Sequence, residues 1–360
     1  MKILLLTKYS NKGASSRLRT MQYIPFLRAE GIEVTVRSLF DDMYLDSLYC
    51  DKKRSFLKVL LQYIKRCCSL TRALRYDVIW IEKELFPGFP ALFERLFKLF
   101  GVRFIVDYDD AVFHNYDLSN SKAVRALLSQ KIDVVMHSAN AVIAGNRYLA
   151  DRAIKAGAKE VVIIPTVIDL ERYKVKPSER DDRLVIGWIG SPSTQKYVVE
   201  ISNVLEEVCQ NFGAKLLLVG ANTNVAENFT NIDIEIVEWT ETTEVELINK
   251  IDIGIMPLPD GPWEKGKCGY KLIQYMACAK PVVASPVGVN VEIVDNNKCG
   301  YLASSADEWR DALISLLSSS EKRKECGAAG RHAVETKYCV QAQVAKLAKL
   351  FRDIAKVDNR

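Results

Sequence analysis

Two glycines and two lysines at the predicted start of a helix, near Tyr270, have the types and spacing of an anion-binding site. Gly266 and Gly269 leave backbone N–H groups accessible, and Lys267 and Lys271 add positive charge. A helix N-terminus, nearby lysines and an open backbone together favour phosphate. The alternative from these residues alone is an ordinary corner between two elements, with surface lysines.

A second candidate loop contains Gly190, Ser191 and Lys196, and it follows a predicted strand. Glycine allows the backbone to approach a diphosphate, and the hydroxyl and the ammonium supply donors. The alternative for Lys196 is a surface lysine at a helix start. Trp239 follows another predicted strand, where its ring would stack on a nucleobase or fill the core.

Three carboxylates, Asp107, Asp109 and Asp110, end a buried strand of the first half, and His114 follows them. Carboxylates so close together repel one another, and such clusters are typical of sites where charge has a role. They would hold a substrate hydroxyl or a developing positive charge. A metal site and simple helix capping are the alternatives.

The segment from Gly13 to Arg17 lies between the first predicted strand and the first predicted helix. It lacks G-x-G-x-x-G, which argues against a dinucleotide-dependent dehydrogenase. The small residues of this loop allow a phosphate or another substrate to approach closely. Arg17 would pair with phosphate through two parallel hydrogen bonds, or it is a solvated helix residue.

Predicted strands alternate with predicted helices throughout, which indicates parallel sheets covered by helices. A proline-containing charged segment, 165–182, is the expected linker between two such units. We therefore expect α/β domains at 1–170 and 183–339, with a last helix at 340–356 and a long first helix at 16–30. The expected strands are 2–7, 33–38, 77–81, 104–107, 141–144, 161–164, 184–189, 215–219, 232–236, 253–256 and 281–284.

Composition sets the class of protein. The 360 residues carry a formal charge of +5 and are 49% hydrophobic and 26% charged, as in ordinary globular proteins. No apolar run reaches the roughly 18 residues of a membrane span, and the first residues do not resemble a signal peptide. Nine cysteines without a C-x-x-C pair predict free thiols in the cytoplasm. The three histidines are not spaced as metal ligands, and we expect no nucleic-acid partner.

Residues 52–75 are strongly basic and amphipathic. On a helical wheel Lys58, Gln62, Lys65 and Arg66 occupy one wedge about 100° wide, and the remainder is apolar. Such a helix would lie on an anionic membrane surface. The alternative is a packed helix with a solvated basic face.

The segment around the first candidate site closely resembles the donor-binding signature of family-four retaining glycosyltransferases of the GT-B fold. That signature runs "Lys-x-x-Glu-x-Met-Ala-x-Gly-x-Pro-Val-Val-Ala-Ser". The matching residues are Lys271, Met276, Ala277, Pro281, Val282, Val283, Ala284, Ser285 and Gly288. The sequence departs from the family at Gln274, which replaces the second Glu of a Glu-x7-Glu motif, at Gly266 in place of the first, and at Ala279 in place of a frequent glycine.

The resemblance implies a GT-B fold, with two Rossmann-like doubly wound parallel-sheet domains facing a cleft. It places the C-terminal helix, 340–360, against the N-terminal domain. It implies transfer of a sugar from a nucleotide-sugar donor to a glycan or lipid-linked acceptor, with retention, in synthesis of cell-surface polysaccharide or glycoconjugate. Alternatives are a non-catalytic nucleotide-sugar or glycan-binding protein and a nucleotide-sugar epimerase of the same fold.

The resemblance also implies roles for individual residues. Asp109, Asp110 and His114 are expected to act on the acceptor or the sugar, and Arg17 to lie on the acceptor side. No metal or other cofactor is expected, because this fold generally needs none. We expect a cytoplasmic protein, peripheral on the inner face of the cell membrane through residues 52–75. The expected donor-binding residues are Gly13, Gly190, Ser191, Lys196, Trp239, Lys267, Gly269, Lys271 and Gln274.

Overall fold

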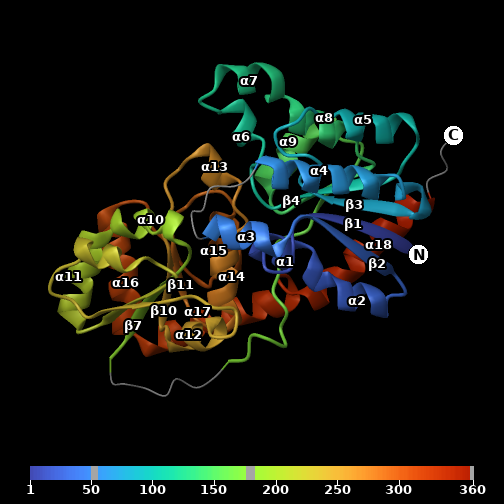
Figure 1. Cartoon of the computed structure of the whole chain (residues 1–360). Helices are drawn as coiled ribbons and strands as arrows, with labels where there is room; N and C mark the ends of the chain where they lie inside the picture. The colour runs from blue at the N-terminus through green and yellow to red at the C-terminus, as the bar shows by residue number, and fades with distance from the viewer. Residues whose placement is uncertain (50–55, 176–182, 357–360) are drawn as a thin grey trace. The chain divides into compact units, whose positions relative to one another are not determined.

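The computed structural model describes residues 1–49, 56–175 and 183–356, and the chain divides into two compact units (Figure 1). Unit 1 comprises Met1–Thr166 and Gln343–Arg360, and unit 2 comprises Val167–Ala342. Each unit is built around its own parallel sheet, as the alternation of strands and helices predicts.

The described strands of unit 1 form a six-stranded sheet in the order β2-β1-β3-β4-β5-β6. Its central strands are apolar runs buried on both faces, as expected for a parallel sheet covered by helices. The strand order reverses between β1 and β3, and ligands of such sheets bind beyond the carboxyl ends of the strands at that point. The strands are β1 (Lys2–Tyr9), β2 (Glu33–Phe40), β3 (Val78–Glu82), β4 (Phe104–Tyr108), β5 (Ala141–Ala144) and β6 (Val161–Ile163).

The expected long first helix, 16–30, is wrong. The chain instead forms α1 (Ala14–Arg19), a 3-10 turn η1 (Met21–Tyr23) and α2 (Ile24–Ala29). Pro25 lies in the first turn of α2, where its missing N–H is tolerated, and it cannot continue a helix from the preceding turn. The other helical segments of unit 1 are α3 (Asp42–Tyr49), α4 (Phe56–Leu70), η2 (Ala73–Arg75), α5 (Leu92–Leu99), α6 (His114–Asp117), α7 (Lys122–Leu128), α8 (Lys131–Ser138) and α9 (Arg147–Lys155).

The described strands of unit 2 form a second six-stranded parallel sheet, in the order β12-β11-β10-β7-β8-β9. Here the order reverses between β7 and β10. The short strand β12 was not expected, because three partly buried residues carry too little apolar periodicity to predict. The strands are β7 (Val185–Ile189), β8 (Lys215–Val219), β9 (Ile234–Val237), β10 (Ile253–Met256), β11 (Val282–Ala284) and β12 (Gly300–Leu302).

Apolar side chains alternate along the strands of unit 2, so each face of the sheet is buried under helices. One face carries Trp188 and the other carries Ile189. No helix among the described residues is both long and apolar enough to traverse a bilayer. The helical segments are η3 (Pro192–Thr194), α10 (Lys196–Val199), α11 (Ser202–Phe212), η4 (Thr223–Asn228), α12 (Glu244–Lys250), α13 (Pro262–Lys265), α14 (Tyr270–Ala277), α15 (Val289–Asn297), α16 (Ala306–Ser318) and α17 (Ser320–Thr336).

The last helix, α18 (Val340–Lys356), has the bounds expected from the sequence. Its C-terminal part belongs to unit 1, where Phe351 packs edge-on against Trp80 with 5.2 Å between ring centroids. Arg352 donates a hydrogen bond to the backbone carbonyl of Glu30 and pairs with its carboxylate. Side-chain packing and ion pairing therefore attach this helix to the N-terminal sheet.

Candidate functional site

The loop that follows β7 lies at the switch point of the second sheet and begins with Gly190. A Cβ at this position would lie 2.2 Å from the ring of Trp188 and 2.8 Å from Nζ of Lys271. Both distances are too short for real atoms, so only glycine fits here. The structure thus brings together Gly190 and Lys271, which the sequence places 81 positions apart.

Lys271 is the central cation of this cluster. Its ammonium lies 4.4 Å from the centre of the Trp188 ring, in the range of a cation–π contact. No ion pair with a carboxylate forms at Lys271 within the described parts of the chain. Burial, and then the charge of Lys267, lower the pKa of Lys271 to about 7. A partly buried cation beside a second cation offers a strong position for an anion.

The helix that carries Lys271 begins at this cluster. Gly269 is the residue before α14, and its φ of +66° lies in the left-handed region, which favours glycine. A Cβ there would also lie 2.4 Å from Cδ1 of Ile293. No side chain of the described chain caps this helix start, so its positive end adds to the two lysines. The arrangement suits a phosphate, and binding of a phosphate here stays a prediction.

Ser191 and Lys196 are exposed on the segment after Gly190. The Ser191 hydroxyl lies 2.9 Å from the Ser193 hydroxyl, and it caps the turn η3. The Lys196 ammonium lies 5.2 Å from the centre of the Tyr197 ring, at the start of α10. Both side chains can reach a ligand from solvent, and their expected role in binding a donor stays a prediction.

Trp239 and Gln274 meet in a second polar cluster of unit 2. Trp239 donates from Nε1 to Glu244 at 2.8 Å, and Tyr173 donates its hydroxyl hydrogen to the same carboxylate. Gln274, which is buried, donates from Nε2 to the Tyr173 oxygen at 3.1 Å. Sequence reasoning missed Tyr173 and Glu244, because neither lies in a recognisable motif. Gln274 therefore contacts a tyrosine that is already bonded to a carboxylate.

The carboxylates of unit 1 follow β4 and occupy two different environments. Asp107 is buried, accepts a hydrogen bond from Nε of Arg19 at 2.7 Å, and lies 3.3 Å from Nε1 of Trp80. Burial raises the pKa of Asp107 to about 6, although Arg19 opposes the shift. Asp109 and Asp110 lie farther along the loop, where their side chains are partly exposed.

Lys83 holds the two outer carboxylates, and sequence reasoning missed it. Its ammonium lies 2.9 Å from Asp109 and 3.6 Å from Asp110, and it donates to the Ser15 hydroxyl at 3.0 Å. Lys83 follows β3 with φ of +64°, an unusual backbone state for a residue with a side chain. Nothing in the local sequence predicts this conformation, although position 83 follows a predicted strand.

This ion pairing fixes the charge of the cluster. Burial raises the pKa of Asp109, but the charges of Lys83 and Arg19 outweigh it and hold the pKa below its ordinary value. Burial likewise opposes the charge of Lys83, but Asp109 and Asp110 hold its pKa above the ordinary value. Asp109 is therefore an ionised hydrogen-bond acceptor at neutral pH.

The remaining predicted site residues of unit 1 make other contacts. His114 uses both ring nitrogens, 2.8 Å from Asp117 and 2.9 Å from the Tyr148 hydroxyl. Arg17 donates to the Asn11 carbonyl at 3.0 Å. Gly13 precedes α1, where a Cβ would lie 2.4 Å from Cβ of Tyr9, so this tight loop needs glycine. Their roles in binding or catalysis stay predictions.

A metal site built by the protein alone would gather three or more side-chain ligands around one point. Among the residues that the structure describes, no group of three His, Cys, Asp or Glu side chains is arranged in this way. The Lys83 ammonium lies beside both outer carboxylates, where a metal ion would otherwise bridge them.

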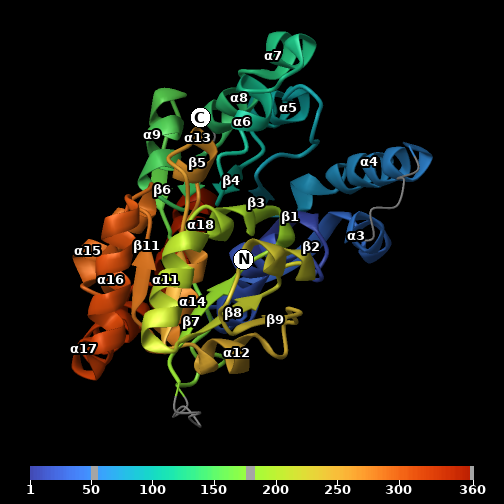
Figure 2. The same ribbon diagram turned by 90° about the vertical axis from the view of Figure 1, so that its left-hand side faces the viewer.

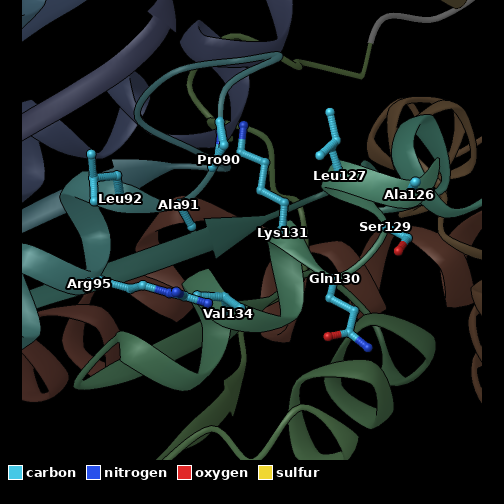
Figure 3. A pocket seen from close by; sticks show the side chains of 10 residues that line it. All are labelled: Pro90, Ala91, Leu92, Arg95, Ala126, Leu127, Ser129, Gln130, Lys131 and Val134. Atoms are coloured by element: carbon cyan, nitrogen blue, oxygen red, sulfur yellow. The ribbon is translucent and has the colours of Figure 1, made fainter. Parts of the chain in front are cut away.

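A cavity of about 510 Å³ opens elsewhere in unit 1, between α5, α7 and α8 (Figure 3). Lys131 lines it, but this buried ammonium donates to Glu84, to the Phe86 carbonyl and to the Tyr116 hydroxyl. Its three hydrogens are thus used within the protein. The cavity wall therefore offers no unsatisfied charge from Lys131 to a ligand.

Comparison with known proteins shows the fold, and a family model matches part of the chain. The family model "Glycosyl transferases group 1" matches residues 183–319, most of unit 2. The chain is 22% identical over 278 residues to N-acetyl-alpha-D-glucosaminyl L-malate synthase of Bacillus anthracis, covering 65% of this chain and 71% of that protein.

Two further similarities extend over most of the chain. A teichuronic acid biosynthesis glycosyltransferase of Bacillus subtilis, TuaH, assigned that role provisionally, is 23% identical over 300 residues, or 75% of this chain and 70% of that one. The structure of Anabaena HepE with UDP and glucose superposes with a TM-score of 0.73 at 16% identity, covering 98% of this chain and 100% of that chain. This structural likeness shows the same fold.

Proposed function

We propose that the chain is a group 1 glycosyltransferase of a retaining family, and that it transfers a sugar from a nucleoside-diphosphate sugar to a hydroxyl of a glycan or lipid-linked acceptor. Its fold is GT-B. The product would be a cell-surface polysaccharide or glycoconjugate. The proposal includes action in the cytoplasm, at the inner face of an anionic membrane reached through residues 52–75.

The observation that carries the proposal is the cluster around Lys271. It combines a glycine that no other residue can replace, a cation without a carboxylate partner in the described chain, a second lysine and an uncapped helix start. These groups suit a diphosphate leaving group, whose negative charge grows as the bond to the sugar breaks. In this proposal Lys271 and Lys267 neutralise that charge.

The chemistry at the acceptor is assigned to the loop after β4. Asp109, held ionised by Lys83, and Asp110 beside the same ammonium would accept the hydrogen of the attacking hydroxyl. Arg17 and His114 would contact the acceptor from the neighbouring loops. No metal is part of this proposal, because ammonium groups and a helix dipole supply the positive charge that the leaving diphosphate needs.

The first experiment is a thermal-shift screen of UDP-, GDP- and dTDP-sugars, followed by a transfer assay with the donor that stabilises most. UDP is the first candidate, because HepE was solved with UDP and with UDP-glucose. Sugar appearing on a glycan acceptor, with its anomeric configuration retained, would support the proposal. Binding without transfer to any acceptor would indicate a nucleotide-sugar-binding protein, and a changed sugar without an acceptor would indicate an epimerase.

A further inference from the structure

The basic amphipathic helix α4 packs with the opposite orientation from the one that its sequence suggests. Within the basic wedge, Gln62 and Arg66 turn toward the protein, while Lys58 and Lys65 stay exposed. Arg66 is buried and donates to the Thr7 carbonyl, and Gln62 donates to Asp41. Burial lowers the pKa of Arg66 to about 10, with the charge of Glu82 opposing the shift. The expectation that Arg66 belongs to a solvated basic face is therefore wrong.

The apolar side of α4 consequently faces the solvent. Leu57, Leu60, Leu61 and Ile64 are 63%, 41%, 48% and 49% exposed. Their spacing of i, i+3, i+4 and i+7 places them in one stripe, about 100° wide, along the helix. In Figure 2 the helix extends outward from the sheet of unit 1. We call these four residues the α4 stripe.

Charged and aromatic groups border the α4 stripe. Lys58 and Lys65 are exposed, and neither has an ion-pair partner in the described chain. Because they are seven residues apart, they lie on the same flank of the helix. On the other side Phe89 is 57% exposed and packs against Tyr63, with 5.5 Å between ring centroids. The surface is therefore apolar at its centre and cationic along one edge.

We propose that the α4 stripe inserts into the headgroup region of an anionic bilayer, with Lys58 and Lys65 at the level of the lipid phosphates. The proposal rests on the proposed function, and deepens it by naming the surface on which the enzyme would meet a lipid-linked acceptor. Shallow insertion of an apolar helix face, with lysines extending to the headgroups, needs no further contact area.

A second copy of the chain fits the α4 stripe less well. Four half-exposed side chains offer an area on the order of a few hundred Å². A stable dimer buries about 800 Å² on each partner. Two stripes brought face to face would also bring four unpaired lysines together, which costs electrostatic energy.

The test uses flotation of the full-length protein with vesicles containing phosphatidylglycerol, at about 0.1 M and about 0.5 M salt. The triple variant Leu57→Gln/Leu61→Gln/Ile64→Gln should lose vesicle binding at least tenfold at both salt concentrations. The double variant Lys58→Gln/Lys65→Gln should lose only the part of the binding that salt removes. Glutamine keeps helix propensity, and all five positions are exposed, so folding is preserved.

The matched control is Ile154→Gln, at a position of α9 that is 58% exposed. In Figure 2 the helix α9 lies on the other side of unit 1 from α4. It should bind vesicles as the wild type does. The depth of insertion into the bilayer can be read directly from a Leu61→Trp variant. Brominated lipid should quench the fluorescence of the introduced tryptophan. Adsorption by charge alone would give the opposite ranking, with the lysine variant abolishing all binding.

Three results would overturn the inference: triple-variant binding equal to wild type, complete loss of binding in the lysine variant at both salts, or a dimer that only the triple variant loses. Transfer to a short soluble acceptor is measured in parallel. The triple variant should retain it, because no residue of the α4 stripe belongs to either candidate substrate site. Absence of transfer in the wild type would refute the proposed function while leaving the vesicle result to stand alone.

Discussion

Binding of the donor diphosphate should draw a proton onto Lys271. In the free protein burial and the charge of Lys267 lower the pKa of Lys271 to about 7. At pH 8 roughly nine in ten copies of this side chain are therefore neutral, since one pH unit is a tenfold change. A bound diphosphate should raise the pKa again towards the ordinary value of about 10.4, because it supplies the missing opposite charge.

The magnitude follows from this cycle. About 0.9 proton should be taken up for each UDP bound at pH 8, and affinity should fall about tenfold for each pH unit above 7, or about 1.4 kcal/mol. At pH 8 the nucleotide is fully ionised, because its last phosphate pKa is near 6. Uptake measured by calorimetry in two buffers with different ionisation enthalpies therefore reports on the protein.

The control variant is Lys271→Met, which keeps an unbranched stem over Trp188 and removes the charge. It should bind UDP more weakly by about 1.5–3 kcal/mol at pH 6.5, where the wild-type lysine is mostly charged, and should take up almost no proton. Near pH 9 the two proteins should converge. Tight UDP binding by wild type at pH 8 without proton uptake would show that Lys271 does not face the diphosphate.

The same shift has a consequence for stability. Folding lowers the pKa of Lys271, so the unfolded chain binds more protons between pH 7 and about 10.4, and this group contributes increasing stability as pH rises through that window. Without bound nucleotide, the Lys271→Met protein should accordingly be more stable than wild type at pH 6–7. Thermal denaturation without nucleotide measures it, and an equal or lower Tm for the variant at pH 6 would contradict the burial of this charge.

The order of the elements was predictable because each buried strand is a short apolar run between turn residues. The GT-B fold was accordingly confirmed, and the last helix has its expected bounds. The failures have local causes. Pro25 divides the expected first helix, and β12 has three partly buried residues with no period to detect.

The candidate sites were predictable only in part. Loops that follow parallel strands meet at one edge, so Gly190 and Lys271 could be expected together from strand order. The role of Lys83 could not be predicted, because the position of its side chain depends on a left-handed backbone conformation. Glycine and asparagine favour that conformation, and position 83 is neither. Arg66 shows that the sequence also does not predict which face of a helix is buried. A helical wheel gives the angle between side chains, but buried partners such as the Thr7 carbonyl decide which side packs inward.

Three further predictions address the metal, the acceptor loop and the departure at Gln274. Transfer should survive EDTA, because ammonium groups supply the positive charge; full loss restored by Mn²⁺ or Mg²⁺ would reassign the aspartates as metal ligands. Lys83→Met should reduce transfer at least tenfold and move the acidic limb of the pH–rate profile upward, since the pKa of Asp109 loses its main lowering charge, while UDP binding in unit 2 stays unchanged. An unmoved profile would remove Lys83 from this role. Gln274→Glu, which restores the residue typical of the family, should destabilise the protein at pH 7 by about 1–3 kcal/mol. The single hydroxyl hydrogen of Tyr173 already goes to Glu244, so Tyr173 has none left to donate to a second carboxylate, which would also repel the first. Thermal denaturation should show this loss shrinking towards pH 4.5, where a carboxyl group takes up the missing proton; a variant as stable as wild type at pH 7 would contradict the hydrogen-bond order Gln274 to Tyr173 to Glu244.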